Sequence, residues 1–397
     1  MSNRALFVTT VPLTLQAFLL PLADELRTQG WSIDALTGDP SDLVMLGDEK
    51  TLQSHFDIIH RIGWSRSLKS LVRLPKYSRQ IRKLVRESGY NVVHVHTPIA
   101  AFVTRYALKQ LSPAKRPRVI YTVHGFHFQD CDHPSFLERF YKTAERYSIH
   151  TTDDLVVMND RDMKAGQELV ALTHNCERPT VLHRIDGTGL DFSLYRRQDD
   201  SESHNNRQLL RKQHGIPEDA FLVGMIAEMN ENKRHYVVIE CAQRLAERDR
   251  SVIQQPIHFL FIGSGPLQDK LKQMVDSFGL SNTIHFTDQI SHQEVRALIT
   301  ICDLGLLVSK REGLPRSLME FVASGVPVIG SNIRGITDIA QDPDALAEPI
   351  PDALAQLIEY YMNNPELLPA LAERQYTHAV EFYDKSVVLE KYLELYS

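Results

Sequence analysis

Cysteine is scarce in this sequence and nowhere clustered. The four cysteines of the 397-residue chain form no C-x-x-C pair and stand far apart, at Cys131, Cys176, Cys241 and Cys302. A disulfide framework or a zinc ribbon needs closely spaced cysteines, so neither is indicated. Scattered free thiols fit a reducing compartment, and we expect a cytosolic protein.

Long apolar runs are missing as well. No stretch approaches the roughly 18 uninterrupted apolar residues of a membrane-spanning helix, so we expect any membrane contact to be peripheral. The first residues, MSNRALFVTTV, pass directly into an expected strand, without the apolar run and small-residue cleavage site of a signal peptide. The sequence therefore predicts neither a secreted nor an integral membrane protein.

Neither sign of charge dominates the chain. The 44 Lys and Arg residues and 50 Asp and Glu residues give a formal net charge of −6, which does not make the whole molecule a polyanion binder. Hydrophobic residues make up 43% and charged residues 24%, a globular composition that excludes disordered and collagen-like classes. At about 150 residues per domain, the length predicts two to three domains.

Short apolar runs alternate with longer amphipathic segments, as they do in repeated βαβ units. Most runs are too continuously apolar for half-exposed antiparallel strands, so they predict parallel sheets covered by helices on both faces. In the first half the expected strands are Ala5–Val11, Trp31–Leu36, Asp57–His60, Asn91–Val95, Arg118–Val123, Leu155–Met158 and Pro179–His183. In the second half they are Phe221–Ile226, Ile257–Ile262, Thr283–Phe286, Leu304–Val308 and Val326–Ile329.

A polar tract without apolar residues, RRQDDSESHNNR after Tyr195, separates the two series of strands. We interpret it as a domain boundary, although a solvated loop within one domain fits the same composition. The expected fold class is α/β, with one domain at 1–200, a second at 201–379 and a last helix at 380–397 that packs back on the first. The two doubly wound sheets are expected to face a central cleft, with ligands at the carboxyl ends of their strands.

The most informative segment is LGLLVSKREGLPRSLMEFVASGVPVI, residues 304–329. It predicts a buried strand, a turn, a helix that opens near Pro315 and ends at Gly325, and then another strand. The amide groups of Gly313 and Leu314, at this strand-to-helix turn, can hold an anion or sugar hydroxyls. A ligand site is therefore expected at the turn.

Two carboxylates accompany this turn and helix. Glu312 stands at the mouth of the turn, and Glu320 follows eight positions later, about two helical turns further on. At that separation the two side chains would address different parts of one extended ligand. The alternative is that both only complement the helix dipole, which is worth about 0.3–1 kcal/mol each.

This E-x7-E spacing, between the EGLP turn and the SGVPVI strand, resembles glycosyltransferase family 4, and within it bacterial capsule, exopolysaccharide and O-antigen glycosyltransferases. The resemblance implies the GT-B fold of two Rossmann-like domains. It also implies that Glu312 and the amides after it hold the donor sugar, while Glu320 binds the ribose of the nucleotide. The donor-binding residues expected here are Gly313, Leu314, Pro315, Arg316 and Glu320.

A glycine-rich turn supports the resemblance. IGSGP, which begins at Ile262, places Gly263 and Gly265 where a strand turns into a helix, so the backbone can approach a diphosphate closely. A tight turn that needs glycine is the simpler alternative. The position of this turn before the E-x7-E segment resembles the G-x-G-P turn of the family.

The segment MIAEMNENKRH supplies Lys233, and the resemblance implies that this lysine neutralises the departing diphosphate. The family has a second cation where this chain has Glu228. A carboxylate cannot stabilise a phosphate, so either Arg234 or Arg316 compensates or Glu228 contacts the sugar or acceptor instead. An inactive site is the further alternative.

Two segments of the first half are further candidates. VIYTVHGFHF puts His124 at the end of a strand, where the family has a histidine beside the donor sugar, and a neutral imidazole there could hydrogen-bond a hydroxyl. FVTTVPLTLQAF lacks the Gly-Gly loop of many family members and instead offers the hydroxyls of Thr9, Thr10 and Thr14, before a helix expected near Leu15. Thr10 is taken as the donor-binding residue of this turn.

Histidines near these strand ends raise a zinc hypothesis. His94 and His96 lie on one face of a strand with H-x-H spacing, which is known among zinc ligands, and His124 and His127 form a second pair. No Asp, Glu or Cys stands nearby at ligand spacing. We therefore expect no metal and interpret His94 and His96 as structural residues.

Positive charge is concentrated in one segment. Residues 61–90 hold nine Lys and Arg residues and one acid, Glu87, a net charge of +8, and their apolar residues recur at helical spacing with Pro75 dividing two helices. Each basic residue near an anionic leaflet contributes on the order of 1 kcal/mol, so docking on a membrane is expected, with a solvated helix face as the alternative. Nucleic acid is not expected, because no aromatic stacking platform accompanies the charge. The residues assigned to this face are Arg66, Lys69, Arg73, Lys76, Arg79, Arg82 and Lys83.

These features predict a retaining, metal-independent hexosyltransferase that uses a nucleotide sugar, a UDP-sugar by the resemblance, and a lipid-linked glycan acceptor in cell-surface polysaccharide synthesis. The expected catalytic residues are His124, Lys233 and Glu312. Retention is implied by the family alone, and no D-x-D motif stands out to hold a divalent ion. Two alternatives remain: a UDP-sugar 2-epimerase that needs no acceptor, and a silent scaffold in a polysaccharide assembly complex.

Overall fold

A computed structural model describes residues 3–39, 48–65, 68–126, 128, 136–195, 201–248 and 255–397, with the backbone alone at 68–70 and 201–204. The chain forms two compact units. Unit 1 comprises residues 1–188 and 388–397, and unit 2 comprises residues 189–387. The chain thus leaves unit 1 after Thr188 and returns to it at Val388.

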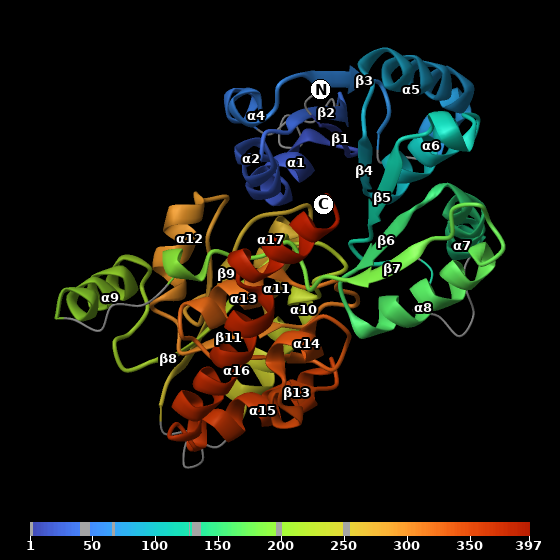
Figure 1. Ribbon diagram of the computed structural model, residues 1–397. Coiled ribbons are helices and arrows are strands. Elements are labelled where there is room, and N and C mark those ends of the chain that lie inside the picture. The colour runs from blue at the N-terminus through green and yellow to red at the C-terminus, as the bar shows by residue number, and fades with distance from the viewer. Residues whose placement is uncertain are drawn as a thin grey trace. The chain divides into compact units, whose positions relative to one another are not determined.

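Unit 1 is built on a seven-stranded sheet in the order β3-β2-β1-β4-β5-β6-β7 (Figure 1). Every pair of neighbours is parallel. The strands are β1 (Arg4–Val8), β2 (Ser32–Gly38), β3 (Ile59–Ile62), β4 (Val92–His96), β5 (Arg118–Thr122), β6 (Asp154–Val157) and β7 (Val181–Arg184). The order reverses between β1 and β4, which makes the sheet doubly wound.

Helices cover both faces of this sheet, which explains why its strands are apolar without alternation. Leu6 and Val8 belong to the core on one face, whereas Ala5 and Phe7 belong to the core on the other. On the first face lie α5 (Leu74–Ser88), α6 (Pro98–Leu108), α7 (Phe136–Ser148) and α8 (Asp160–Val170). On the second lie α1 (Pro12–Phe18), α2 (Leu20–Thr28), α4 (Glu49–His55) and the end of α17 (Lys385–Glu394).

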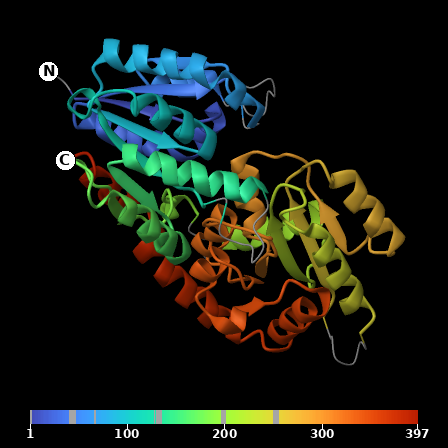
Figure 2. The same ribbon diagram turned by 90° about the vertical axis from the view of Figure 1, so that its right-hand side faces the viewer.

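The C-terminal segment is part of the unit 1 core. Val388, Tyr392, Leu395 and Tyr396 are all buried against β1 and its neighbours, and Figure 2 shows the red C-terminus beside the blue and green elements of unit 1. The phenol of Tyr396 lies 2.7 Å from Nδ1 of His94. Residues at the two ends of the chain therefore share one core.

Unit 2 has a six-stranded parallel sheet in the order β10-β9-β8-β11-β12-β13. The strands are β8 (Phe221–Ile226), β9 (Ile257–Ile262), β10 (Ile284–Phe286), β11 (Leu304–Leu307), β12 (Val328–Ser331) and β13 (Leu346–Ala347). The helices are α9 (Ser201–Gln213), α10 (His235–Ala246), α11 (Gln268–Ser277), α12 (His292–Ile299), α13 (Arg316–Ala323), α14 (Ile336–Ala340), α15 (Pro351–Asn363) and α16 (Leu367–Tyr383). Short 3-10 helices in the two units are η1 (Leu68–Arg73), η2 (Pro113–Lys115), η3 (Ile149–Thr151), η4 (Ala171–Thr173), η5 (Phe192–Leu194) and η6 (Pro343–Ala345).

Two glycines seat helix α13 on the second sheet. A Cβ atom at Gly224 or Gly305 would lie 2.9 or 2.6 Å from the ring of Phe321, so glycine is needed where this buried ring meets β8 and β11. Gly325, with φ of +73°, follows the end of the helix as expected. The helix that carries Glu320 is thus held against the sheet at its point of reversal, between β8 and β11.

The expected α/β architecture is confirmed, with two doubly wound parallel sheets. All twelve expected strands form, and the short β13 was not expected. The helix expected near Leu15 begins earlier, at Pro12, because proline suits the first turn of a helix. In the part of the chain that the structure describes, no helix is both long and apolar enough to cross a membrane.

Candidate active site

In unit 2 the loop from β8 to α10 is folded around one asparagine. Oδ1 of Asn230 accepts hydrogen bonds from the backbone amides of Asn232 and Lys233 at 3.0 and 3.1 Å. Nδ2 of Asn230 donates to Glu228 at 2.9 Å, and Glu228 itself is exposed. Glu228 therefore accepts a hydrogen bond from a side chain of its own loop.

This loop is joined to the loop between β11 and α13. The amide of Lys310 donates to the carbonyl of Asn232 at 2.7 Å, and Nδ2 of Asn232 donates to the carbonyl of Arg311 at 3.0 Å. Nζ of Lys233 then lies 2.5 Å from Oε1 of Glu312. Both side chains are largely buried, at 19% and 11% exposure, so the two expected catalytic residues of unit 2 form one shielded ion pair.

The turn after Glu312 is supported by the neighbouring loop from β12 to α14. Nε of Arg334 donates to the carbonyl of Glu312 at 3.1 Å. Gly335 has φ of +77°, and a Cβ atom there would lie 2.4 Å from the carbonyl oxygen of Gly313. Sequence reasoning missed both residues, since only the sheet order places β12 beside β11.

Glu320 lies on α13 and is almost fully buried, with 4% exposure. Its Oε1 accepts hydrogen bonds from the phenol of Tyr195 and from Nε of Arg316, each at 3.0 Å. Burial and the nearby Glu320 carboxylate raise the pKa of Tyr195 to about 12. Burial opposes the charge of Arg316, but Glu320 and Tyr195 outweigh it, so the pKa of Arg316 is raised.

Arg316 is thus engaged by Glu320 inside unit 2, which leaves Arg234 as the other candidate for the missing cation. Arg234 occupies the N-cap position of α10 with φ of +51° and makes no side-chain capping bond, and its Nε is buried without a hydrogen-bond partner among the described residues. The next residue, His235, is buried, and neither of its ring nitrogens has a partner there. Unsatisfied buried polar atoms therefore gather beside Lys233.

The two glycines of the IGSGP segment have an intramolecular reason to be glycine. Gly263 has φ of +130°, and a Cβ atom there would lie 2.6 Å from the carbonyl oxygen of Ala227. At Gly265 it would lie 2.5 Å from the amide of Met229. In the structure, these glycines therefore allow their turn to pack closely against the backbone of the β8–α10 loop.

In unit 1, Thr10 and His124 come together at one cavity of about 330 Å³. Burial lowers the pKa of His124 to about 4, so its imidazole is neutral near pH 7. Thr9 turns inward instead, since its hydroxyl donates to the carbonyl of Val11 at 3.0 Å. His127 lies outside the described residues.

His94 and His96 share one face of β4, with ring centroids 4.2 Å apart. His94 is bonded to Tyr396 and to Thr122, at 2.7 and 2.8 Å, and Nδ1 of His96 lies 3.3 Å from Nε2 of His124. No group of three or more His, Cys, Asp and Glu side chains in the described part of the chain is arranged to hold a metal ion. The structure thus gives these histidines partners in the core of unit 1.

The basic side chains of α5 lie on the surface of unit 1, as the segment's pattern predicts. Lys76, Arg79 and Lys83 are exposed, as is Arg73 just before the helix, whereas Arg82 is half-buried. Val72, one of the apolar residues of this segment, is 85% exposed. Arg66 and the side chain of Lys69 lie outside the described residues.

Helix α7 extends this basic surface. Its two acids, Glu138 and Glu145, are buried, at 8% and 5% exposure, whereas its basic side chains are exposed at Arg139, Lys142 and Arg146. The residues just after α6 join α7 to α5, because Nζ of Lys109 lies 3.6 Å from the ring centroid of Tyr147 and Gln110 donates to Ser78 at 3.0 Å. We call the exposed basic residues of α5 and α7 the basic face.

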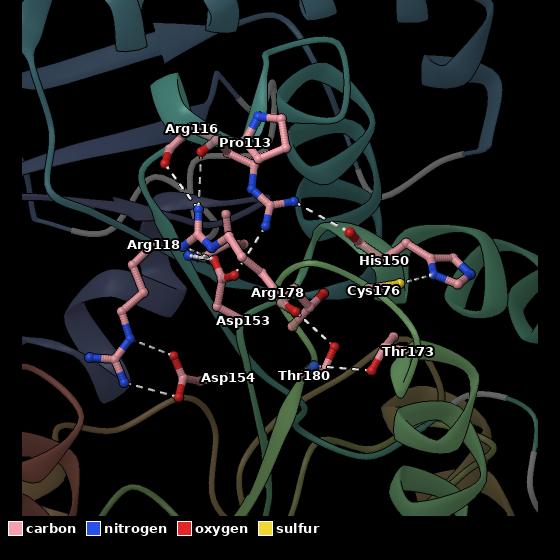
Figure 3. A network of polar contacts seen from close by, with 12 residues as sticks. Pro113, Arg116, Arg118, His150, Asp153, Asp154, Thr173, Cys176, Arg178 and Thr180 are labelled. Carbon is pink, nitrogen blue, oxygen red and sulfur yellow. Dashed lines mark hydrogen bonds and ion pairs between the residues drawn. The ribbon is translucent and has the colours of Figure 1, made fainter.

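A second charged network lies at the opposite ends of the strands in unit 1, where β5 and β6 begin (Figure 3). The carboxylate of Asp153 lies 3.0 Å from Arg116 and 2.9 Å from Arg178, and it accepts the amide of Val119 at 2.7 Å. Burial raises the pKa of Asp153 and lowers that of Arg116. The groups with shifted pKa values here link the starts of neighbouring strands to each other. They lie away from the carboxyl ends of the strands, where the candidate site is.

Two family models match this chain. Glycosyltransferase Family 4 matches residues 16–171, within unit 1, and Glycosyl transferases group 1 matches residues 206–378, within unit 2. Each model therefore corresponds to one of the two sheets.

Two relatives agree with these models. The chain is 29% identical to the putative glycosyltransferase EpsD of Bacillus subtilis, over 100% of this chain and 97% of that protein. It is 23% identical to the UDP-Gal:alpha-D-GlcNAc-diphosphoundecaprenol alpha-1,3-galactosyltransferase of Escherichia coli, over 67% of this chain and 64% of that protein.

A solved structure shows the same fold. The crystal structure of Anabaena Alr3699/HepE in complex with UDP superimposes with a TM-score of 0.74 at 18% identity, over 100% of this chain and 99% of that one. The fold and the family matches together cover both units. The chain belongs to glycosyltransferase family 4 and has the GT-B fold.

Proposed function

We propose that this protein is a retaining, metal-independent transferase that moves a sugar from a UDP-sugar to a hydroxyl of a lipid-linked glycan in cell-surface polysaccharide synthesis. The observation that carries the proposal is the Lys233–Glu312 pair at the reversal point of the second sheet, one of the places where doubly wound sheets bind nucleotides. The E. coli relative, named for UDP-Gal and a diphosphoundecaprenol-linked substrate, supports the donor and acceptor classes.

In the proposed donor complex, Lys233 stabilises the negative charge that develops on the departing diphosphate. Arg234 supplies the second positive charge, because its Nε is buried without a partner in the described part of the chain and Arg316 is held by Glu320. The amides of Gly313 and Leu314 and the half-charge of the α13 N-terminus add to this stabilisation. These groups would perform the role that a divalent ion has in metal-dependent transferases.

Glu312 holds hydroxyls of the donor sugar in this proposal, and Glu320 holds the ribose. Glu320 is already fixed by Tyr195 and Arg316, so its carboxylate needs little reordering when a nucleotide binds. Pro315 at the N-cap of α13 and the glycine turn at Gly263 and Gly265 keep the surrounding backbone in place. Retention of anomeric configuration is proposed from the family resemblance alone.

The last part of the proposal is that the protein associates peripherally with the inner surface of the cytoplasmic membrane. The basic face supports it, because α5 and α7 expose basic side chains while both acids of α7 are buried. Each exposed cation near an anionic leaflet adds on the order of 1 kcal/mol of attraction. A membrane location would bring the enzyme to a lipid-linked acceptor.

A two-part experiment tests the proposed reaction. UDP, GDP and ADP, and their sugars, are screened for their effect on the melting temperature; a ligand at 100 times its dissociation constant adds about 2.7 kcal/mol of stability. Stabilisation by UDP and transfer of label from a UDP-sugar into butanol-extracted lipid are expected. Turnover of UDP-N-acetylglucosamine without any acceptor would favour the epimerase alternative, and no nucleotide binding at all would favour the silent scaffold.

A further inference from the structure

The cavity of unit 1 lies where its sheet reverses direction. The strand order changes between β1 and β4, and such reversal points are where open parallel sheets bind ligands. Thr10 follows β1, Thr97 follows β4 and His124 follows β5, so three adjacent strand ends supply polar groups to the cavity wall. Its volume of about 330 Å³ is at the small end of the range for ligand pockets, roughly 300–1,000 Å³.

The hydroxyls of Thr10 and Thr97 are fixed in one orientation. Oγ1 of Thr97 donates to the carbonyl of His96 at 2.5 Å and lies 2.7 Å from Oγ1 of Thr10. Because the proton of Thr97 is used on His96, Thr10 must donate to Thr97. The oxygen of Thr10 is then left with lone pairs, so it accepts hydrogen bonds and suits a ligand that carries a hydroxyl proton.

Among the described residues, the rest of the cavity wall carries no ionised side chain. The described lining residues besides these two threonines are Pro98, Ile99, Tyr121, His124, Gly125 and Tyr141. His124 is a neutral imidazole near pH 7, since burial lowers its pKa to about 4. It can exchange hydrogen bonds with a hydroxyl, but it cannot act as the counter-ion of a phosphate or carboxylate.

Two buried charges behind the cavity wall are satisfied by each other. Arg105 lies behind Tyr121, with its guanidinium carbon 4.0 Å from the ring centroid, and pairs with Glu145 at 2.8 Å. The phenol of Tyr121 donates to the same Glu145 at 3.1 Å. The N-terminus of α6 adds a partial positive charge beside the cavity but no counter-ion, so an anion buried here would be poorly compensated.

We propose that this cavity binds an uncharged sugar ring of the acceptor, with a hydroxyl donating to Thr10 and the apolar ring face against Pro98, Ile99 and Tyr141. The inference rests on the proposed function and names the chemical class of its acceptor: a neutral hexose or N-acetylhexosamine, and not a uronic acid or a sugar phosphate. An anionic group of the acceptor would have to lie outside this cavity.

The test compares neutral and charged probes of the same shape. Saturation-transfer NMR on the full-length protein measures methyl glycosides of glucose, galactose, mannose and N-acetylglucosamine, together with methyl glucuronide, methyl galacturonide and glucose 6-phosphate. At least one neutral glycoside should bind, and its charged counterpart should bind at least tenfold more weakly. Equal or tighter binding of the charged probes, or no binding of any neutral glycoside, would overturn the proposal.

Variants locate the binding. Thr10→Val removes the accepting oxygen at nearly constant volume and should weaken glycoside binding about tenfold, whereas Thr10→Ser should keep it. Thr143→Val, an exposed threonine of α7, is the matched control. Unchanged glycoside binding in Thr10→Val would place the sugar elsewhere. UDP affinity is measured on each variant in parallel, because a protein that binds the glycoside but not UDP would contradict the proposed function while the sugar site itself is retained.

Discussion

Nζ of Lys233 lies 2.5 Å from Oε1 of Glu312, although 79 residues separate them in the sequence. Both side chains are largely shielded from water, so the pair is held by more than a surface attraction. In the free protein, Lys233, which is proposed to bind the diphosphate, is therefore paired with Glu312, which is proposed to bind the donor sugar. A UDP-sugar would have to share or displace this contact when it binds.

The two partners should behave differently when each is removed. Lys233→Ala is expected to lower UDP affinity and to reduce transfer at least 100-fold, because the charge on the leaving diphosphate loses its cation. Glu312→Ala is expected to abolish transfer while UDP affinity is kept or increased, since Lys233 is released from its partner. Calorimetric titration with UDP and a transfer assay measure both effects.

Lys270→Ala is the control for this pair, because Lys270 is an exposed lysine of unit 2 on α11. It should leave UDP affinity and transfer unchanged. Full transfer activity in either Lys233→Ala or Glu312→Ala would remove the pair from the site.

The sequence predicted the elements of this site better than its contacts. Strand, turn and helix at 304–329 followed from local signals, such as continuous apolar residues and Gly325 at the helix end. The contact between Lys233 and Glu312 depends on β8 and β11 lying side by side, which no local pattern records. Arg334 and Gly335 were missed for the same reason, because β12 brings them to the turn from the other side.

Burial also gives a role to residues that the sequence did not single out. Composition gives α7 three basic and two acidic residues, and only the structure shows that Glu138 and Glu145 face inward. Tyr195 ends the segment before the polar tract and carries no motif, yet its phenol bonds to Glu320. The hydrophobic periodicity and the composition indicate which side chains face the core. They do not indicate which side chain each one contacts there, because packing decides that.

Tyr195 is expected to position Glu320. Tyr195→Phe removes one hydrogen bond to a buried carboxylate, which should lower the free energy of unfolding by about 1–3 kcal/mol and weaken UDP binding several-fold. Chemical unfolding and calorimetry measure the two effects. Tyr360→Phe, at an exposed tyrosine of α15, is the control. UDP affinity equal to that of the unchanged protein would show that Tyr195 serves the fold alone.

Stability should fall on mild acidification. Burial lowers the pKa of His94 to about 3 and of His124 and His235 to about 4, against an ordinary value of about 6.5. Below pH 6.5 the unfolded chain therefore takes up protons that the folded chain does not, so stability is complete above this pH and decreases as the pH falls toward 4. Each such histidine should cost about 1 kcal/mol between pH 7.5 and 5.5.

Urea unfolding at a series of pH values measures this loss. His94→Gln cannot titrate and should reduce the loss by about the share of one histidine. An unfolding free energy that stays constant between pH 7.5 and 5.5 would contradict the neutral, buried state of these residues.

The network of Figure 3 should support the fold and not the reaction. Asp153→Asn leaves Arg116 and Arg178 without their shared carboxylate, and removal of one partner from a buried ion pair costs about 3–5 kcal/mol. We expect a large loss in unfolding free energy with unchanged UDP affinity at a temperature where the variant is folded. A selective loss of UDP binding would instead connect this network to the nucleotide site.

The basic face makes a prediction that separates α7 from α5. Vesicles of phosphatidylcholine with and without phosphatidylglycerol are sedimented with the protein, and binding should require the anionic lipid. The triple reversal Arg139→Glu, Lys142→Glu, Arg146→Glu on α7 should reduce binding at least tenfold, as should Lys76→Glu, Arg79→Glu, Lys83→Glu on α5. A matched triple in unit 2, Lys212→Glu, Lys270→Glu, Lys272→Glu, changes the net charge equally and should reduce binding far less. If all three triples weaken binding alike, net charge and not this face governs the attraction; if only the α5 triple does, α7 has no part in docking.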